Sequence, residues 1–302
     1  MGSRLIVALP VVLIVACSSG GGGSTPSPMP PSTDYTAFGN PEQVTIIGYN
    51  GDAMEPFVSR DGVYLFFNNN GANKDIFYSA FINATSVQFQ AAIASINTAA
   101  VEGTPTTDTA SRFFYVTTAN YNPPTTYDTL YSGTWNGSSV TGAAAVSGLA
   151  RTTPGLVNFD IEVSPDGTTL YFADGDFSGG NAFPGSADIA IAIASGNGFA
   201  RDPNSSVILA NVNTTTDLEY APTISADGRE LFFTSPNLNS RQARIYRTTR
   251  SSSNAAFAAP QLVSAITGFV EGPTLSPDEK SLYYHRENTG IGRFEIYRVT
   301  RP

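Results

Sequence analysis

Short runs of consecutive apolar residues recur along the chain, each a few residues after a polar turn. Leu65-Phe66-Phe67 and Leu170-Tyr171-Phe172 are two of them. These runs do not alternate apolar with polar residues, so both faces of each strand are predicted to be buried. Such burial is expected when one sheet is sandwiched between two neighbouring sheets. The remaining runs are Phe114-Tyr115-Val116, Leu231-Phe232-Phe233 and Leu282-Tyr283-Tyr284.

The turn before each run has a recognisable chemistry. In Ser164-Pro165-Asp166-Gly167, proline presets φ, the aspartate bonds nearby backbone N–H groups, and glycine takes the left-handed conformation. The residues on either side are predicted to form a hairpin. Two versions depart from this pattern, with Ala110-Ser111 and Glu279, so these turns are expected to be looser. The five versions read EPFVSRDGVYLFF, TPTTDTASRFFYV, DIEVSPDGTTLYF, APTISADGRELFF and GPTLSPDEKSLYY.

The turns recur at a regular spacing. Their aligned positions are 49, 56, 61 and 51 residues apart, a period typical of repeat architectures. A third strand follows each run, such as DIFYSAF from Asp75, and then a weaker fourth, such as APQLVSAI from Ala259. Five units of four strands predict an all-β fold, a five-bladed β-propeller.

The two ends of the repeat region are expected to meet. The last unit stops at Pro302 after its third strand, and residues 37–47 (AFGNPEQVTII) match the fourth-strand segment 256–266 (AFAAPQLVSAI). The N-terminal strand, about 37–47, is therefore predicted to complete the last blade and close the ring. The alternative architecture, a flat solenoid, is disfavoured by this wrapped-round strand.

The repeat resembles a known family. Ser-Pro-Asp-Gly followed by an apolar-aromatic triplet and a third strand such as Asp-Ile-Phe-Tyr is similar to the WD40-like repeats of the TolB-type propellers and related lipoproteins of the bacterial envelope. The resemblance covers nearly all of residues 37–302. It implies a propeller that binds proteins or serves as an envelope scaffold.

The N-terminus has the pattern of a targeting segment. A single charge at Arg4 precedes the apolar run LIVALPVVLIV, which is too short for a permanent membrane helix. The following IVAC resembles the lipobox of bacterial lipoproteins, which implies cleavage before Cys17 and lipid attachment to its thiol. An ordinary secretory signal with a chance cysteine is the alternative. The expected division is a signal peptide (1–16), a lipidated Gly/Ser/Pro tether (17–35) and a propeller (36–302).

Composition narrows the function classes. Cys17 is the only cysteine, so the folded part has no disulfide. The net charge is −9, and −10 without Arg4, so nucleic acid is not expected as a partner. We expect a monomer held to the membrane by its lipid on the periplasmic side of the envelope. Ser18 after the cysteine implies the outer membrane in this family.

One carboxylate precedes each first strand. First strands line the central channel of a propeller, so these residues are expected to form an acidic ring that repels itself unless a cation, an arginine or a lysine enters it. Their offsets to the aligned turn position are 6, 8, 6, 8 and 7 residues, which is not a strict register. The alternative is that each carboxylate bonds backbone N–H groups of its incoming loop. The candidate ligand-binding residues are Glu55, Glu102, Asp160 (or Glu162), Glu219 and Glu271.

Two loops carry weaker signals. Tyr121 and Tyr127 flank a proline pair and are candidate residues for stacking on sugar rings. Asp174, Asp176 and Ser178 alternate as at the start of a calcium loop, but the twelfth position is glycine rather than glutamate. We therefore predict no metal site and interpret this segment as a loop between strands, with a structural calcium site as the weaker alternative.

Catalytic motifs are scarce. His285 is the only histidine and is expected to be a hydrogen-bonded structural residue. The sequence contains no GxSxG and no P-loop, and no cofactor is expected. One enzymatic alternative stays open, glycoside hydrolysis by two channel carboxylates. The favoured hypothesis is a non-catalytic, lipid-anchored propeller that binds an envelope protein or a glycan.

Overall fold

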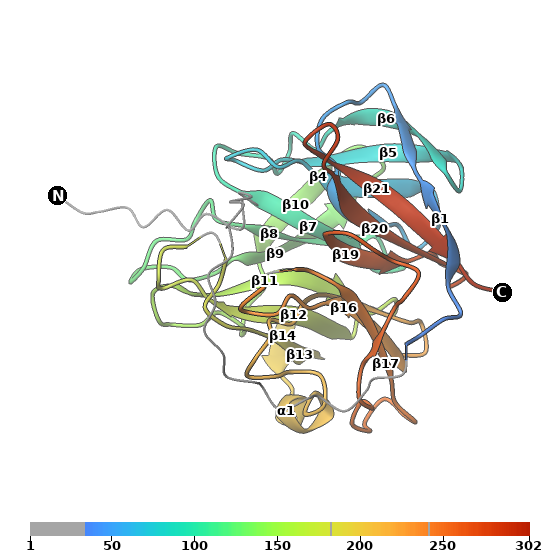
Figure 1. The fold of residues 1–302 in the computed structure, drawn as a ribbon. Helices are drawn as coiled ribbons and strands as arrows, with labels where there is room; N and C mark the ends of the chain where they lie inside the picture. The colour runs from blue at the N-terminus through green and yellow to red at the C-terminus, as the bar shows by residue number, and fades with distance from the viewer. Residues whose placement is uncertain (1–33, 182, 241) are drawn as a thin grey trace, which may run out of the picture.

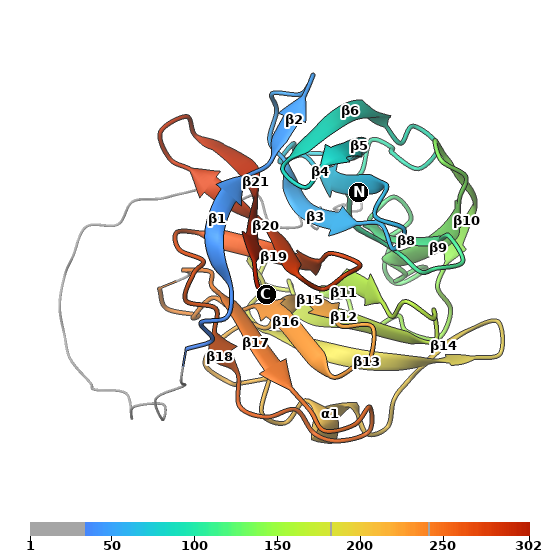
Figure 2. The ribbon, with the colours of Figure 1, turned by 90° about the vertical axis from the view of Figure 1, so that its right-hand side faces the viewer.

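The computed structural model describes residues 34–181, 183–240 and 242–302. Its strands form five sheets that follow one another around a central axis (Figures 1 and 2). The predicted five-bladed β-propeller is therefore confirmed. A single short helix, α1 (Ser205–Ile208), interrupts the β structure of the described residues. No helix in this part of the chain has the length and apolar character needed to cross a membrane.

Each blade runs outward from the channel in strand order. The first blade contains β3 (Met54–Val58), β4 (Tyr64–Asn68), β5 (Ile76–Asn83) and β6 (Ser86–Ala92). The second contains β7 (Glu102–Thr107), β8 (Arg112–Thr117), β9 (Leu130–Trp135) and β10 (Val140–Ala145). The third contains β11 (Leu156–Val163), β12 (Thr169–Asp176), β13 (Ala187–Ser195) and β14 (Gly198–Arg201). The fourth contains β15 (Tyr220–Ile224), β16 (Glu230–Thr234), β17 (Ile245–Thr249) and β18 (Gln261–Leu262). The fifth contains β19 (Val270–Leu275), β20 (Ser281–Asn288), β21 (Arg293–Thr300) and β1 (Gly39–Gln43).

The apolar triplets explain how the blades hold together. On β4, Leu65 and Phe67 pack into the core shared with the fifth blade, whereas Phe66 packs into the core shared with the second blade. The triplets of the third, fourth and fifth blades divide in the same way. In the second blade the turn is one residue shorter, so Tyr115 faces the first blade while Phe114 and Val116 face the third. Five separate cores thus fill the five junctions between blades. Burying one such side chain contributes about 2 kcal/mol. Continuous apolar runs are therefore required by the ring.

The N-terminal segment closes the ring, as the sequence indicates. β1 pairs antiparallel with β21 of the fifth blade (Figure 2). The chain then crosses at Val44, and β2 (Thr45–Ile47) pairs in parallel with β6 of the first blade. The segment 37–47 thus serves two blades instead of one. Tyr35, placed in the tether by the sequence, already bonds the fourth blade through its N–H to Leu262 O.

Two turns differ from expectation. Ser111 and Glu279 adopt φ values of 63° and 58°, close to the 69–72° of the glycines at the same position in the other three blades. The turn of the fifth blade keeps a 2.8 Å bond between Glu279 N–H and Ser276 O, so the prediction of a looser turn is wrong there. In the second blade the equivalent bond from Ser111 is 3.3 Å long.

Candidate functional site

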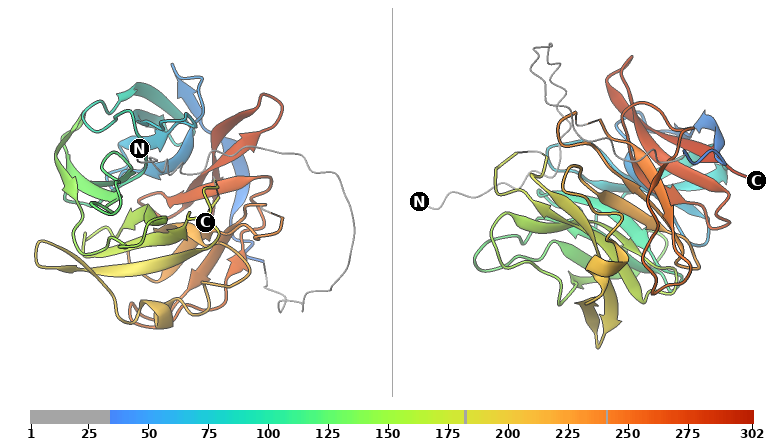
Figure 3. Two further views of the ribbon diagram at one scale, coloured as in Figure 1. Left: turned by 90° about the vertical axis from the view of Figure 1, so that its left-hand side faces the viewer. Right: turned by 60° about the horizontal axis from the view of Figure 1, so that its bottom comes forward.

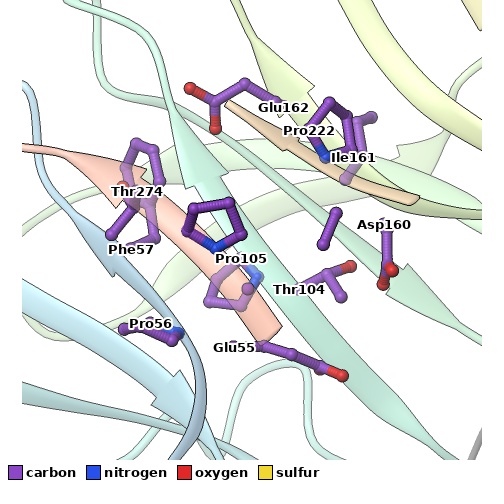
Figure 4. A pocket seen from close by; sticks show the side chains of 13 residues that line it. Glu55, Pro56, Phe57, Thr104, Pro105, Asp160, Ile161, Glu162, Pro222 and Thr274 are labelled. Carbon is purple, nitrogen blue, oxygen red and sulfur yellow. The ribbon is translucent and has the colours of Figure 1, made fainter. Parts of the chain in front are cut away.

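The inner strands β3, β7, β11, β15 and β19 surround the central channel, seen from opposite sides in Figures 2 and 3. Each contains a β-bulge, whose first residue has a φ between 47° and 63°. These five residues line a channel cavity of about 30 Å³ (Figure 4). That volume holds about two water molecules. The bulge residues are Glu55, Thr104, Asp160, Ala221 and Gly272.

The bulge turns backbone groups toward the neighbouring blade. The N–H of Glu55 donates to Nδ1 of His285 in the fifth blade at 3.0 Å. The N–H of Thr104 donates to Oδ1 of Asn68 in the first blade at 3.2 Å. Each such bond satisfies a buried donor and joins two blades at the channel wall. The corresponding bonds of Gly272 and Ala221 go to Thr234 Oγ1 and to the carboxylate of Asp160.

The candidate carboxylates occupy three different positions relative to the bulge. Glu55 and Asp160 are bulge residues, Glu271 precedes one directly, and Glu102 and Glu219 lie two residues earlier. The unequal offsets in the sequence have this origin. Consequently Glu55, Asp160 and Glu271 come close enough to interact electrostatically, whereas Glu102 and Glu219 bond to their own loops.

Glu102 and Glu219 stabilise the loops that enter their strands. Glu102 accepts the N–H and the hydroxyl of Thr98, both at 2.8 Å. Glu219 accepts the N–H of Thr214 at 3.1 Å and its hydroxyl at 2.9 Å. Burial raises the pKa of Glu219 to about 8, despite these hydrogen bonds. The two residues therefore have the loop-bonding role that the sequence left open as the alternative.

A lysine side chain lies among the channel carboxylates. Nζ of the buried Lys74 lies 3.2 Å from Oε1 of Glu55, while Glu55 Oε2 has no hydrogen-bond partner among the described residues. Burial raises the pKa of Asp160 well above its usual range, and the charges of Glu55 and Glu271 raise it further. Lys74 opposes this shift without outweighing it. Asp160 is accordingly favoured in its neutral form, which reduces the repulsion expected of the ring.

Glu271 is held by two neutral donors. The hydroxyl of Tyr220 donates to its Oε1. His285 Nδ1 already accepts the N–H of Glu55, so the ring proton lies on Nε2, which donates to Glu271 Oε2 at 3.2 Å. His285 is fully buried with both nitrogens engaged. It is therefore a structural link between blades, and no free imidazole faces the channel.

Arg60 crosses the other end of the channel. Its Nη2 contacts Glu162 Oε1 at 2.6 Å, and its Nε bonds Thr107 O in the second blade. Glu162 also accepts the hydroxyls of Thr106 and Thr223 from the blades on either side. Figure 4 places Glu162 at the opposite end of the lining from Glu55. Side chains from four blades thus fill this part of the channel.

The candidate aromatic residues lie outside the channel. Tyr121 accepts the N–H of Gly155 at 2.9 Å and packs against the core between the second and third blades. Tyr127 meets it edge to face, with 6.4 Å between ring centroids. This pair anchors a surface loop, and Tyr127 is half-buried.

The aspartates of the calcium-like loop are hydrogen-bonded within the third blade. Asp174 is bonded by Arg201 and by Asn158, and Asp176 accepts the N–H of Ser178. Within the described ranges, no three His, Cys, Asp or Glu residues form a group suited to a metal ion. Cys17 lies outside the described residues.

Sequence reasoning missed the partners of the channel carboxylates. Lys74 comes from the loop between β4 and β5, and Arg60 from the turn between β3 and β4. Lys74 is one of only two lysines in the chain, which is a signal that could have drawn attention to it. The prolines that follow four of the five bulge residues mark the channel positions more reliably than the carboxylates do. They are Pro56, Pro105, Pro222 and Pro273.

Comparison with known proteins supports the fold. No protein-family model matches the sequence, and no curated protein matches it. Among solved structures, a putative exo-β-1,3-galactanase from Bifidobacterium bifidum has a TM-score of 0.54 at 11% identity, over 86% of this chain and 91% of that one. An endo-arabinase from Bacteroides thetaiotaomicron has a TM-score of 0.52 at 11% identity, over 86% and 98%. At these identities the likeness shows the fold alone.

TolB from Acinetobacter baumannii is also similar, with a TM-score of 0.48 at 13% identity over 83% of this chain. This chain spans 55% of the length of that TolB. TolB-type propellers and glycoside hydrolases therefore both occur among its structural neighbours.

Proposed function

We propose that this protein is a non-catalytic, lipid-anchored propeller of the bacterial envelope that binds a protein or a glycan through its loop faces. The supporting observation is that the carboxylates of the channel are already bonded to other side chains and leave little space between them. Its carboxylates are bonded by Lys74, Arg60, Tyr220 and His285, and the cavity between them is about 30 Å³. Ligand pockets usually measure about 300–1,000 Å³. A sugar ring has no room beside these carboxylates.

The glycosidase alternative needs two carboxylates with room between them for a glycosidic bond. Asp160 has the raised pKa of a general acid. However, Glu55 is paired with Lys74, Glu271 accepts bonds from Tyr220 and His285, and the cavity beside them, of about 30 Å³, leaves no room for a glycosidic bond. The geometry therefore favours binding over hydrolysis.

Two assays on the full-length chain test the proposal. Arabinan and β-1,3-galactan, the substrate classes named for the two structural neighbours, are incubated with wild type and with Asp160→Asn. We expect no release of reducing ends. Release by wild type that disappears in Asp160→Asn would establish the glycosidase and reject the proposal.

The second assay looks for the partner. The tagged protein is crosslinked in intact cells of its native host and identified with its neighbours by mass spectrometry, with Cys17→Ala as the control that cannot be lipidated. We expect a reproducible envelope partner that is lost or reduced in the control. Identical recovery from both would contradict the role of the anchor.

A further inference from the structure

The outer strand of the second blade, β10, has an open edge on the rim of the molecule (Figure 2). Its residues Thr141–Ala145 are all exposed. Just before them, Val140 N–H donates to Ser95 Oγ at 2.9 Å, and just after them Ser147 O accepts the N–H of Phe199 at 3.3 Å. Between these two contacts, the hydrogen bonds of the described structure join β10 to β9 alone.

This edge presents unpaired backbone groups. Val146 N–H donates inward to Leu130 O of β9 at 2.9 Å. Backbone groups alternate in direction along an antiparallel strand, so the N–H and C=O of Ala145 point outward. A β-bulge between Thr141 and Ala144 interrupts the first half of β10 and leaves the second half regular.

The composition of β10 does not block further pairing. Edge strands commonly avoid it with charged residues or with proline. β10 has neither, and no charged residue occurs between Asp128 and Arg151. The edge is therefore both open and neutral.

The other four blades protect their outer edges within the described residues. β2 covers the start of β6 in the first blade, and Tyr35 pairs in parallel with Val263 beyond β18 in the fourth. β14 has only four residues and ends at Arg201, and β1 contains Pro41 and Glu42. At two edges the chain thus adds its own extended N-terminal segment as a further parallel strand. β10 has no such cover.

We propose that β10 binds an extended, uncharged segment of a partner protein, which adds to the second blade as a fifth strand parallel to β10. Main-chain hydrogen bonds supply the affinity in this mode of recognition. The parallel direction is the one that the chain's own segment takes at the first and fourth blades. This rim surface is separate from the loop faces of the proposed function and stands without them.

A second copy of the chain fits this edge less well. Two β10 strands would each bring a bulge to the junction, and a bulge disrupts the ladder of hydrogen bonds. A regular segment from another protein meets only one bulge and pairs with the half of β10 that follows it.

Photocrosslinking in the native host tests the edge. The photoreactive residue p-benzoylphenylalanine replaces Ala145 in the full-length chain and Ala194 in a control. Ala194 is also an exposed alanine, but it pairs with Phe199 on one side and its N–H donates to Thr168 O on the other. We expect a light-dependent adduct with another protein from position 145 only. No adduct above the control, or an adduct only with a second copy of this chain, would overturn the proposal.

The crosslinked segment of the partner, located by mass spectrometry, is then synthesised and titrated against the purified protein. Saturation should slow hydrogen exchange of the Ala145 amide. Ala145→Pro removes the outward N–H at a position where edge strands tolerate proline, and should weaken peptide binding about tenfold, the equivalent of one hydrogen bond.

Ala145→Lys keeps the backbone N–H and should fold even if the proline variant does not. Its charge on the edge should also weaken binding. Ala194→Lys is the matched control and should leave the Kd unchanged. Wild-type affinity in both Ala145 variants would rule out strand addition at β10.

The outcomes separate this surface from the proposed function. An envelope partner recovered by general crosslinking, with no adduct at position 145, would reject the edge and leave the proposed function intact. Hydrolysis of arabinan or β-1,3-galactan would reject the proposed function, while the adduct at position 145 would still support the edge.

Discussion

Arg301, the penultimate residue of the chain, donates two parallel hydrogen bonds to Glu230 of the fourth blade, both 2.7 Å long. The same arginine bonds the hydroxyl of Tyr35 at 3.0 Å. Burial opposes ionisation of Glu230, but the bonds from Arg301 and Arg247 outweigh it and lower the pKa of this carboxyl. The two ends of the described chain therefore meet at Arg301, which binds them to Glu230 on the second strand of the fourth blade.

Removing this contact should weaken closure of the ring. Arg301→Ala leaves Glu230 with one partner, and hydrogen bonds to charged groups are worth about 1.5–3 kcal/mol, so we expect a loss of about 2 kcal/mol. Urea unfolding measures it. Glu42→Gln, which breaks the half-exposed pair with Arg298, is the control and should cost less than about 1 kcal/mol. Equal losses in both variants would contradict a special role for Arg301.

Lys74 should contribute strongly to the free energy of unfolding, because it is the cation beside the channel carboxylates. Lys74→Met leaves the largely covered Glu55 without its cation beside Asp160, which is expected to cost about 3 kcal/mol. The double variant Lys74→Met/Glu55→Gln removes the unpaired charge and should recover part of that loss. Lys280→Met, at the exposed second lysine, should change the free energy of unfolding little. Additive losses in the double variant would contradict the pairing.

Stability should fall as pH rises through the neutral range. Glu219 has a pKa of about 8 when folded and about 4.5 when unfolded, so between these values the folded state holds a proton that the unfolded state has lost. Each such proton lowers the free energy of unfolding by about 1.4 kcal/mol per pH unit. Asp160, whose pKa is also raised, adds to the decline.

Urea unfolding at pH 5, 6 and 7 checks this dependence. In Glu219→Gln, the free energy of unfolding should fall less steeply with pH, by about 1.4 kcal/mol per pH unit. Asp227→Asn should leave the slope as it is, because the Ser225 hydroxyl holds the pKa of Asp227 below its ordinary value and the residue is ionised throughout this range. A wild-type stability that rises with pH would show that Glu219 is not buried in its neutral form.

The turn of the second blade should be open to stabilisation. Ser111 has a φ of 63°, a conformation that costs a residue with a Cβ roughly 1 kcal/mol. Ser111→Gly is therefore expected to raise the free energy of unfolding by up to about 1 kcal/mol, after the entropy cost of glycine. Ser111→Ala keeps the Cβ and should bring no gain. Thermal unfolding of wild type and the two variants distinguishes them. A gain in the alanine variant would show that loss of the hydroxyl, rather than loss of the Cβ, is stabilising.

Local patterns along the chain were enough to predict the architecture. Five copies of a turn followed by an apolar triplet predicted five blades, because only a strand packed on both faces requires such runs. The match between residues 37–47 and 256–266 predicted the closing strand for a similar reason: both segments complete a blade at its outer edge. These are local patterns, and each copy repeats the same information.

The roles of the channel carboxylates, in contrast, depend on how the blades pack around the axis. Five acidic residues that look equivalent in the sequence occupy three positions relative to the bulge. That position decides whether the side chain lies among the channel carboxylates or bonds its own incoming loop. Their partners Lys74, Tyr220 and His285 come from three other segments of the repeat, whose separation in the sequence carries no sign of contact. Contacts between blades arise when the ring closes, so spacing along the chain does not encode them.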